Sequence, residues 1–165
     1  MKIGIISDTH NNHANIQKVV KTLKDEGISI VIHCGDMVDP DDVWYFDGFR
    51  LIYLFGNMDI ATGTLRDTIL PLRPDNYVDY IFDGVIDGVN IAAVHGDALG
   101  QVDELAQSGK YSYVFCGHTH RRQDEKVGST RVINPGALGG LHEEHRSICI
   151  LNLITGDIWF INISD

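Results

Sequence analysis

The sequence has few cysteines, and they form no pattern of pairs. Cys34, Cys116 and Cys149 are three in number, far apart, and each set in an apolar run. Such spacing indicates neither a disulfide framework nor a CxxC metal site. We therefore expect the three thiols to be core packing residues in a reducing compartment.

Long apolar segments are also lacking. No run approaches the length of a membrane span, and residues 1–4 lead directly into a predicted strand without the charged and apolar regions of a leader segment. These features predict a cytoplasmic protein that does not associate with a membrane.

Positive charge is scarce, because 13 Lys and Arg residues face 23 Asp and Glu residues, giving a formal net charge of −10. Broad binding to nucleic acid or to anionic lipid needs a basic face, so we expect no extended nucleic-acid surface. A phosphate-bearing substrate is still compatible with this charge, since bound divalent ions can reverse the local field.

One pattern occurs five times: a short apolar run, rich in β-branched residues, that stops at a residue able to bind a metal. The runs begin at Ile3, Val31, Leu51, Ile91 and Tyr113. Such runs are typical of strands buried on both faces, and ligands of open α/β sheets bind at the carboxyl ends of the strands. The residues that follow the runs should therefore meet on one rim. They are Asp8, His10, Asp36, Asn57, His95, His118 and His120.

The first third of the sequence alternates predicted strands with helices. Residues 12–26 carry apolar side chains at helical spacing, and Asp39-Pro40 is typical of the start of a second helix. This order predicts a parallel βαβαβ unit with right-handed crossovers. Residues 57–77, interrupted by glycine and proline, are predicted to form a loop region arching over the rim, with one short helix near residues 65–70.

The later part of the sequence has hairpin patterns. The predicted strand pairs are 80–86 with 89–94, 123–127 with 130–133, and 147–154 with 157–163. A helix near residues 102–107 should cover this half, and residues 142–145 should form an exposed loop. A parallel half followed by antiparallel hairpins predicts two packed sheets with helices outside, in a single domain spanning residues 1–165.

The residue types on the predicted rim suit a transition metal. Asp8 and His10 are two residues apart at a strand end, so both side chains can bind one ion, and His118 and His120 repeat this spacing. Carboxylate, amide and imidazole ligands without thiolate suit Mn, Fe, Co, Ni or Zn. Two dications held by only two carboxylates would keep a surplus of positive charge that attracts phosphate.

In order and spacing these residues resemble the motifs of the calcineurin-like metallophosphoesterases, most closely the small prokaryotic phosphodiesterase branch. The matching motifs are Asp8-x-His10, Gly35-Asp36, Gly56-Asn57, His95 and Gly117-His118-x-His120. The resemblance implies an α/β fold, a four-layer α/β/β/α sandwich of two mixed sheets flanked by helices. It also implies a dinuclear centre. One ion would be bound by Asp8, His10, Asp36 and His120, and the other by Asp36, Asn57, His95 and His118.

The activity that the resemblance implies is hydrolysis of a small phosphodiester by attack of a metal-bridging hydroxide. Manganese is the favoured metal, and nickel, iron, cobalt and zinc remain alternatives. Asp36, Asn57 and His95 would carry catalysis. Three other functions stay open: a non-catalytic interaction scaffold like the retromer coat subunit that shares this fold, a phosphomonoesterase, or a nuclease.

Two positions depart from the family pattern. Met58 stands where many members have a histidine that assists the leaving group, and Asp97 stands where close relatives often have a histidine. The candidate substrate contacts are Asn12, His13, Met58 and Arg121. Of these, His13 also fits a solvated helix start, which we favour, and Arg121 also fits a solvated loop edge.

Three further expectations concern surroundings and assembly. His33 lies inside its predicted strand and should be a core histidine. Asp59 should either orient a ligand histidine or face water. Relatives tend to self-associate, so a homo-oligomer, either a dimer or a tetramer, is expected.

Overall fold

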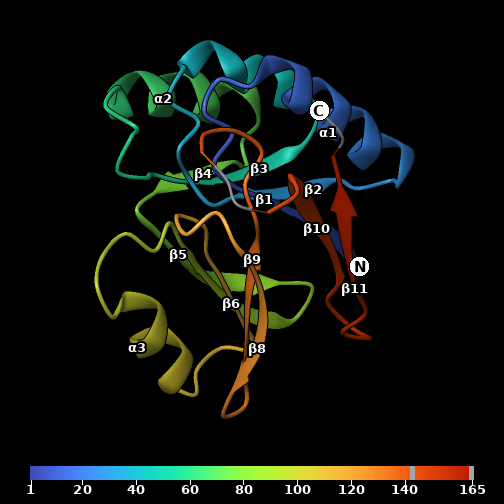
Figure 1. The fold of residues 1–165 in the computed structure, drawn as a ribbon, viewed down its shortest axis with the longest axis vertical. Helices are drawn as coiled ribbons and strands as arrows, with labels where there is room; N and C mark the ends of the chain where they lie inside the picture. The colour runs from blue at the N-terminus through green and yellow to red at the C-terminus, as the bar shows by residue number, and fades with distance from the viewer. Residues whose placement is uncertain (142–143, 164–165) are drawn as a thin grey trace.

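The computed structural model describes residues 1–141 and 144–163, which form four layers (Figure 1). Three helices, α1 (His13–Asp25), the 3₁₀ helix η1 (Pro40–Phe46) and α2 (Thr62–Ile69), cover one face of the first sheet. A second sheet packs below it, and α3 (Gln101–Gln107) lies on the outside of that sheet. The predicted α/β/β/α sandwich is therefore confirmed.

The first sheet has six strands in the order β11-β10-β1-β2-β3-β4. The neighbours β1, β2, β3 and β4 run parallel, and β10 pairs antiparallel with β1. Its strands are β1 (Lys2–Ile6), β2 (Ile30–His33), β3 (Arg50–Leu54), β4 (Tyr77–Asp79), β10 (Ser147–Asn152) and β11 (Ile158–Asn162).

The second sheet has five strands in the order β5-β6-β7-β9-β8. Its central strands β6, β7 and β9 are parallel, and the edge strands β5 and β8 are antiparallel to their neighbours. The strands are β5 (Ile81–Ile86), β6 (Val89–Val94), β7 (Tyr113–Phe115), β8 (Arg122–Val127) and β9 (Thr130–Pro135).

Helix α1 shows why the sequence folds as predicted in the first third. The Asn12 side chain accepts a hydrogen bond from the Asn15 N–H, which satisfies one of the free donors at the start of the helix. Ile16, Val19 and Leu23 form its buried stripe against the sheet. Burial of an aliphatic side chain of this size contributes about 1.5–3 kcal/mol, so this stripe holds the helix on the sheet.

The two sheets are both mixed, as expected, and the structure adds how the strands are distributed between them. The last hairpin, β10–β11, joins the first sheet, and the second sheet has a parallel centre. Residues 57–77 do not form a loop region arching over the rim. Within them α2 packs against η1 and β4, and its Leu65 and Ile69 side chains are buried in the core, so this segment belongs to the helical layer.

The core lies on both sides of the first sheet. Between the sheets, Ile5, Ile32 and Ile52 pack with Phe115 and other residues of the second sheet. The three cysteines are buried and free, as expected for core residues. His33 is also fully buried, which confirms its core position.

The remaining expectations concern the surface. Glu144 and His145 of the expected exposed loop are exposed, and His142 and Glu143 lie outside the described residues. Within the part of the chain that the structure describes, every helix is too short or too polar to cross a membrane.

Candidate metal centre

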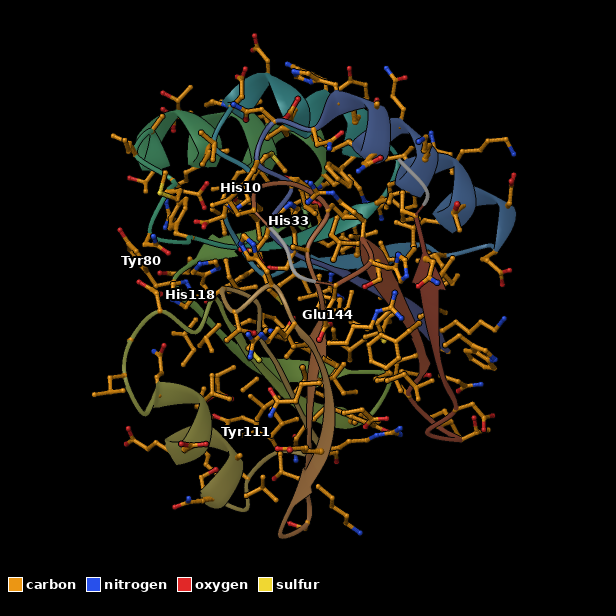
Figure 2. The ribbon with its side chains drawn as sticks, in the orientation of Figure 1. His10, His33, Tyr80, Tyr111, His118 and Glu144 are labelled. Carbon is orange, nitrogen blue, oxygen red and sulfur yellow. The ribbon has the colours of Figure 1, made fainter. Side chains whose placement is uncertain are left out.

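The predicted rim is where the loops after β1, β2, β3, β6 and β7 meet, at one end of the two sheets. Backbone hydrogen bonds join these loops directly. The Asp8 N–H donates to the Gly35 carbonyl at 2.9 Å, and the His10 N–H donates to the Asp36 carbonyl at 3.0 Å. Across the two sheets, the Asp8 side chain accepts the His118 N–H at 3.1 Å. In Figure 2, His10 and His118 appear in this region, whereas Tyr111 lies near α3, well away from it.

Most of the candidate ligands have an unusual backbone conformation. Asp8, His10, Asp36, His118 and His120 have positive φ angles of 53°, 41°, 59°, 65° and 58°. Left-handed backbone is uncommon outside glycine, and each such residue costs on the order of 1 kcal/mol or more. Their concentration at one place indicates that the surrounding fold imposes this geometry for a functional reason.

The first group of candidate ligands consists of Asp8, His10 and His120, whose ligand atoms all lie within 4.8 Å of one another. Nε2 of His120 lies 3.2 Å from Oδ1 of Asp8, and Nε2 of His10 lies 3.8 Å from the same oxygen. The two Nε2 atoms are 3.3 Å apart. Three atoms with lone pairs therefore face one point.

The second group is built around Asp36 and His95. Oδ2 of Asp36 lies 3.4 Å from Nε2 of His95 and 3.7 Å from Nε2 of His10, so one carboxylate oxygen faces both groups. Oδ1 of Asn57 lies 3.1 Å from the same His95 nitrogen. Asp8 also belongs to this group, since its carboxylate lies within 4.8 Å of the ligand atoms of Asp36 and His95.

His118 is the candidate least integrated into the two groups. Its ring centroid lies 5.1 Å from that of His95, but its side chain is exposed, and it is not among the atoms that cluster within 4.8 Å. The structure thus brings six of the seven predicted residues into close contact. The seventh, His118, packs against the ring of His95 at the edge of this cluster.

Charge makes the centre suited to a cation. Burial alone would raise the pKa of Asp8, but the adjacent rings of His10 and His120 outweigh burial and hold this pKa well below its usual range. Burial alone would lower the pKa of His95, but the carboxylates of Asp36 and Asp8 raise it to about 9. The carboxylates therefore hold protons on neighbouring rings, and a divalent ion can replace those protons.

Asp8 gives the most direct test of whether the centre fits a metal. Its Oδ1 atom is buried and has no hydrogen-bond partner among the described residues. An uncompensated buried carboxylate oxygen is costly, and the nearest groups are the imidazole nitrogens of His10 and His120. Oxygen and nitrogen ligands around one point, without thiolate, fit a divalent transition metal.

Backbone carbonyls orient two of the rings. Nδ1 of His95 lies 2.7 Å from the Cys34 carbonyl oxygen, and Nδ1 of His120 lies close to the Leu141 carbonyl oxygen. A ring that donates Nδ1–H to a carbonyl presents the Nε2 lone pair on its other side. Both rings therefore direct Nε2 toward the candidate centre.

Glycine is required where the loops approach most closely. A Cβ atom on Gly56 would lie 2.1 Å from Oδ1 of Asp36, and one on Gly140 would lie 2.8 Å from Cδ2 of His10 and 3.0 Å from Cε1 of His120. Any side chain at these positions would displace a candidate ligand.

Sequence reasoning missed the role of Asp59. It neither orients a ligand histidine nor faces water. Its buried carboxylate accepts hydrogen bonds from the N–H groups of Asp36, Val38 and Gly56 and from the Tyr53 hydroxyl. Asp59 therefore ties the Asp36 loop to the Asn57 loop.

Asn134 was also missed, and it holds the turn at His118. Its side-chain amide donates to the Gly117 carbonyl at 2.7 Å and lies 3.1 Å from Oγ1 of Thr119. The only sequence signal was the Asn134-Pro135-Gly136 segment, which is typical of a turn, although the structure places Asn134 and Pro135 at the end of β9. Nothing in a single sequence links that turn to residues 117–119.

The candidate substrate contacts lie around the centre with different surroundings. Asn12 caps α1, and Met58 is exposed next to Asn57, with its N–H donating to Asp36. Arg121 is exposed on the turn after His120. His13 is exposed at the start of α1 as favoured, but its Nδ1 atom lies 2.7 Å from the Asp42 carboxylate, a pairing that the sequence did not predict. Asp97 is exposed.

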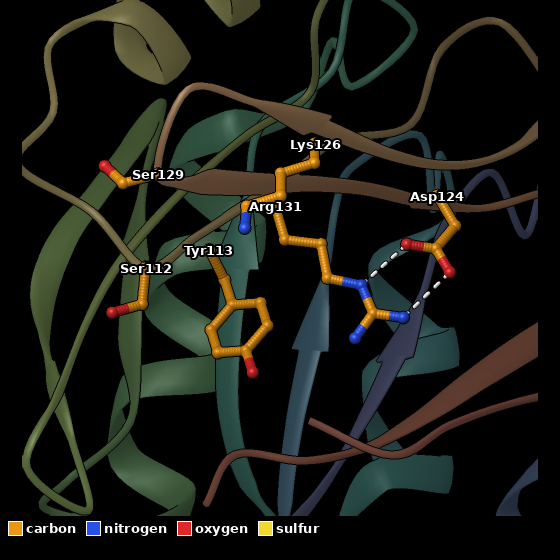
Figure 3. Close-up of a pocket in the computed structure, with 6 residues that line it drawn as sticks. All are labelled: Ser112, Tyr113, Asp124, Lys126, Ser129 and Arg131. Carbon is orange, nitrogen blue, oxygen red and sulfur yellow. Dashed lines mark hydrogen bonds and ion pairs between the residues drawn. The ribbon is translucent and has the colours of Figure 1, made fainter. Parts of the chain in front are cut away.

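A separate hollow of about 470 Å³ lies at the other end of the second sheet, at the start of β7 and β9 (Figure 3). It is lined by Ser112, Tyr113, Asp124, Lys126, Ser129 and Arg131. Asp124 binds the Arg131 guanidinium through two hydrogen bonds of 2.7 and 2.8 Å, which neutralises the arginine. Because its arginine is already paired, the attraction of this hollow for a phosphate is weakened and rests on the Lys126 ammonium.

Comparison with known proteins relates the whole fold, including the candidate centre, to one family. The family profile described as the calcineurin-like phosphoesterase superfamily domain matches residues 1–156. The phosphodiesterase MJ0936 of Methanocaldococcus jannaschii is 35% identical over 142 residues, which cover 85% of this chain and 86% of that protein.

Solved structures agree with this match. The structure of an archaeal phosphodiesterase superposes with a TM-score of 0.94 at 33% identity, covering 99% of this chain and 100% of that one. The structure of Vps29 from Entamoeba histolytica superposes with a TM-score of 0.73 at 17% identity, covering 99% and 100%. The second likeness concerns the fold alone.

Proposed function

This chain belongs to the calcineurin-like phosphoesterase superfamily, and from that premise we propose that it is a metal-dependent phosphodiesterase acting on a small diester at a dinuclear centre. One observation carries the proposal. Oδ2 of Asp36 lies 3.7 Å from Nε2 of His10 and 3.4 Å from Nε2 of His95, so a single oxygen faces both candidate ligand groups. A carboxylate in this position is suited to bridge two ions.

The proposed ligands divide between two ions. One ion would be held by Asp8, His10, Asp36 and His120, and the other by Asp36, Asn57, His95 and His118. When bound, two such ions act as Lewis acids toward a phosphoryl oxygen and lower the pKa of a shared water. We propose manganese as the metal, with nickel, iron, cobalt and zinc as the other candidates, and residues 1–165 as one catalytic domain.

The protein's own residues contribute position and charge. Asp36, Asn57 and His95 form the catalytic core of the proposal, since Nε2 of His95 lies 3.4 Å from Oδ2 of Asp36 and 3.1 Å from Oδ1 of Asn57. The carbonyl groups of Cys34 and Leu141 keep the His95 and His120 rings oriented. Fixed groups of this kind stabilise developing charge without reorganising during the reaction.

The rim surroundings support an organic ester as the substrate. Ile60 and Leu141, on loops that carry or support proposed ligands, are each 91% exposed, and Met58 is 46% exposed. These apolar side chains offer contact area for the alcohol part of a diester. The excess of acidic residues disfavours a long nucleic acid, which would need a basic groove.

Metal reconstitution tests the function. The protein is depleted of metal with a chelator, reloaded with Mn²⁺ or Ni²⁺ or left without metal, and assayed on an aryl phosphodiester, an aryl phosphomonoester and a cyclic nucleotide. We expect two ions per chain by elemental analysis and hydrolysis of the diester only with metal. His95→Ala should lose both activity and one ion, whereas the matched control His145→Ala, at an exposed position, should keep both.

Three outcomes would contradict the proposal. Undiminished hydrolysis without metal would show that the reaction does not depend on a metal. A preference for the monoester would show that the protein is a phosphomonoesterase. Absence of hydrolysis with every metal would favour the interaction scaffold. Size-exclusion chromatography of the same preparation tests whether the protein is the expected dimer or tetramer.

A further inference from the structure

A second hollow, of about 360 Å³, lies between the start of α1 and η1 and is lined by His13, Asp41, Asp42, Trp44 and Tyr45. Both segments that form this hollow also carry residues of the candidate metal centre or lie directly beside it. His13 follows His10 by three residues, so their Cα atoms are at most about 11 Å apart. The Asp39 N–H, at the start of η1, donates to the Asn11 side chain at 2.9 Å and joins the two walls.

Asp42 is the unusual residue of this hollow. It is 0% exposed, and neither of its carboxylate oxygens has a hydrogen-bond partner among the residues described. Nδ1 of His13 lies 2.7 Å from Oδ1, at ion-pair distance but without hydrogen-bond geometry. A buried carboxylate destabilises a protein unless a cation or a donor group compensates it, and here the half-exposed His13 ring is the group at that distance.

The charges around Asp42 also favour a cation in the hollow. Burial raises the pKa of Asp42, and Asp39 and Asp41 raise it further, with only His13 acting against them. The His13 side chain is 54% exposed, so it can turn out of the hollow. A cation that enters in its place could then form the ion pair with the Asp42 carboxylate that His13 forms in this structure.

Aromatic rings form the rest of the wall. The Trp44 ring system is at the surface, 59% exposed, and the rings of His13 and Tyr45 have centroids 6.2 Å apart. The faces of Trp and Tyr attract cations, and an organic ammonium group uses such faces together with a carboxylate. An exposed tryptophan next to a buried carboxylate thus offers apolar contact and charge in one site.

We propose that the hollow formed by His13, Asp41, Asp42, Trp44 and Tyr45 binds the primary ammonium group of an amino-alcohol ester, so that the substrate is a zwitterionic phosphodiester. The identification as a substrate site rests on the proposed function. A primary ammonium is favoured over a quaternary one because its N–H groups give Asp42 the hydrogen bonds that it lacks, whereas a quaternary group contacts only the ring faces.

Fluorescence tests binding without catalysis. The sequence has two tryptophans, so Trp159→Phe leaves Trp44 as the only tryptophan reporter. Titration of this protein with ethanolamine should give a saturable signal, choline a weaker one, and ethanol none. The ethanolamine response should disappear in Asp42→Asn and persist in the matched control Asp47→Asn, which changes an exposed aspartate outside the hollow. An equal response to ethanol, or an unchanged response in Asp42→Asn, would overturn the site.

Kinetics then test the link to substrate. With metal bound, the KM for an aminoethyl aryl phosphodiester should be about tenfold lower than that for the ethyl analogue, as expected for a charge-assisted hydrogen bond. Asp42→Asn should remove this difference and Trp44→Leu should reduce it, whereas the matched control Asp47→Asn should keep both the difference and the kcat of the ethyl ester. Equal KM values for the two esters would overturn the substrate subsite. Ethanolamine binding without hydrolysis of any diester would support the cation site and overturn the proposed function instead.

Discussion

Loss of the Asp59 carboxylate should destabilise the protein far more than loss of any exposed carboxylate. Asp59 is 4% exposed and lies at the junction of two loops that carry proposed ligands. Its Oδ2 atom accepts hydrogen bonds from Asp36 N–H at 3.0 Å, Gly56 N–H at 2.8 Å and the Tyr53 hydroxyl at 2.7 Å. Its Oδ1 atom accepts the Val38 N–H at 3.0 Å.

The magnitude follows from these four bonds. A hydrogen bond to a charged group contributes about 1.5–3 kcal/mol, so four would sum to about 6–12 kcal/mol. Water entering the space left by Asp59→Ala would satisfy part of the freed donors, and we expect a loss of about 3–6 kcal/mol in the free energy of unfolding. Since domains are stable by only about 5–15 kcal/mol, the variant would be close to unfolding.

Asp59→Asn should have a smaller effect. Its single carbonyl oxygen can replace Oδ2, but its NH₂ group would then face the Val38 N–H. Val38 is β-branched and has a φ of 77°, a strained conformation that loses its hydrogen-bonded support. We expect a loss of about 2–3 kcal/mol, intermediate between the wild type and Asp59→Ala.

Urea unfolding of the metal-depleted proteins, followed by circular dichroism, measures these differences. The midpoint should fall in the order wild type, Asp59→Asn, Asp59→Ala, at an unchanged slope. Asp47→Ala, at an exposed position, is the control and should unfold with the wild type. If Asp59→Ala unfolds within about 1 kcal/mol of the wild type, the four bonds do not hold the loops as argued.

Three further predictions concern pH and catalysis. Burial lowers the pKa of His33 to about 3, so below about pH 6.5 the unfolded chain binds a proton that the folded protein excludes. Between pH 7 and 4.5 the free energy of unfolding should therefore fall by about 2–3 kcal/mol more in the wild type than in His33→Asn. Urea titrations measure this, and an equal loss in both proteins would contradict it. Because Met58 cannot donate a proton, aryl phosphodiesters should have a much higher kcat/KM than alkyl ones with the same metal, and equal values would refute this; Met58→His should raise the alkyl rate by about 100-fold. Asn57→Ala should abolish turnover while calorimetry shows an intact fold, so full activity would rule out its assignment as a ligand.

The candidate centre was predictable because its signal is local. Each proposed ligand follows an apolar run that could only be a buried strand, and parallel strands bring their carboxyl ends to one edge. Asp8 and His10 illustrate this, since they follow the last residue of β1 by only two and four residues and must therefore lie at its carboxyl end. The prediction needed no knowledge of which strands are neighbours.

The parts that the sequence left open or predicted wrongly depend on contacts between distant segments. The pairing of β10 with β1, such as Ile150 opposite Gly4, joins residues nearly the whole chain apart, and hairpin patterns carry no information on such a partner. In residues 57–77, the short helix predicted near residues 65–70 corresponds to α2, but glycine and proline nearby favoured a loop over the rim for the segment as a whole. Tertiary packing against η1 outweighed those local signals.

The supporting groups had no distinct signal at all. The carbonyls of Cys34 and Leu141, which orient His95 and His120, belong to the backbone and are present at every residue. The role of Asp59 depends on its burial among four hydrogen-bond donors, which a single sequence does not show. Groups that act through backbone geometry can therefore be identified only from the structure.

Strain and charge at the centre together explain why metal and stability should be coupled. Five proposed ligands have left-handed backbone, and Oδ1 of Asp8 is buried without a hydrogen bond among described residues, so the metal-free fold contains unfavourable free energy at one place. A divalent ion held by these ligands would compensate the carboxylate and restrain the loops, and it would bind the unfolded chain less well because the ligands are then dispersed. Metal at 100 times its dissociation constant should therefore add about 2.7 kcal/mol to the unfolding free energy. At the same metal concentration the gain should be smaller in Asp59→Asn, because the Asp36 and Asn57 loops are then less well positioned to bind the ion and its dissociation constant rises.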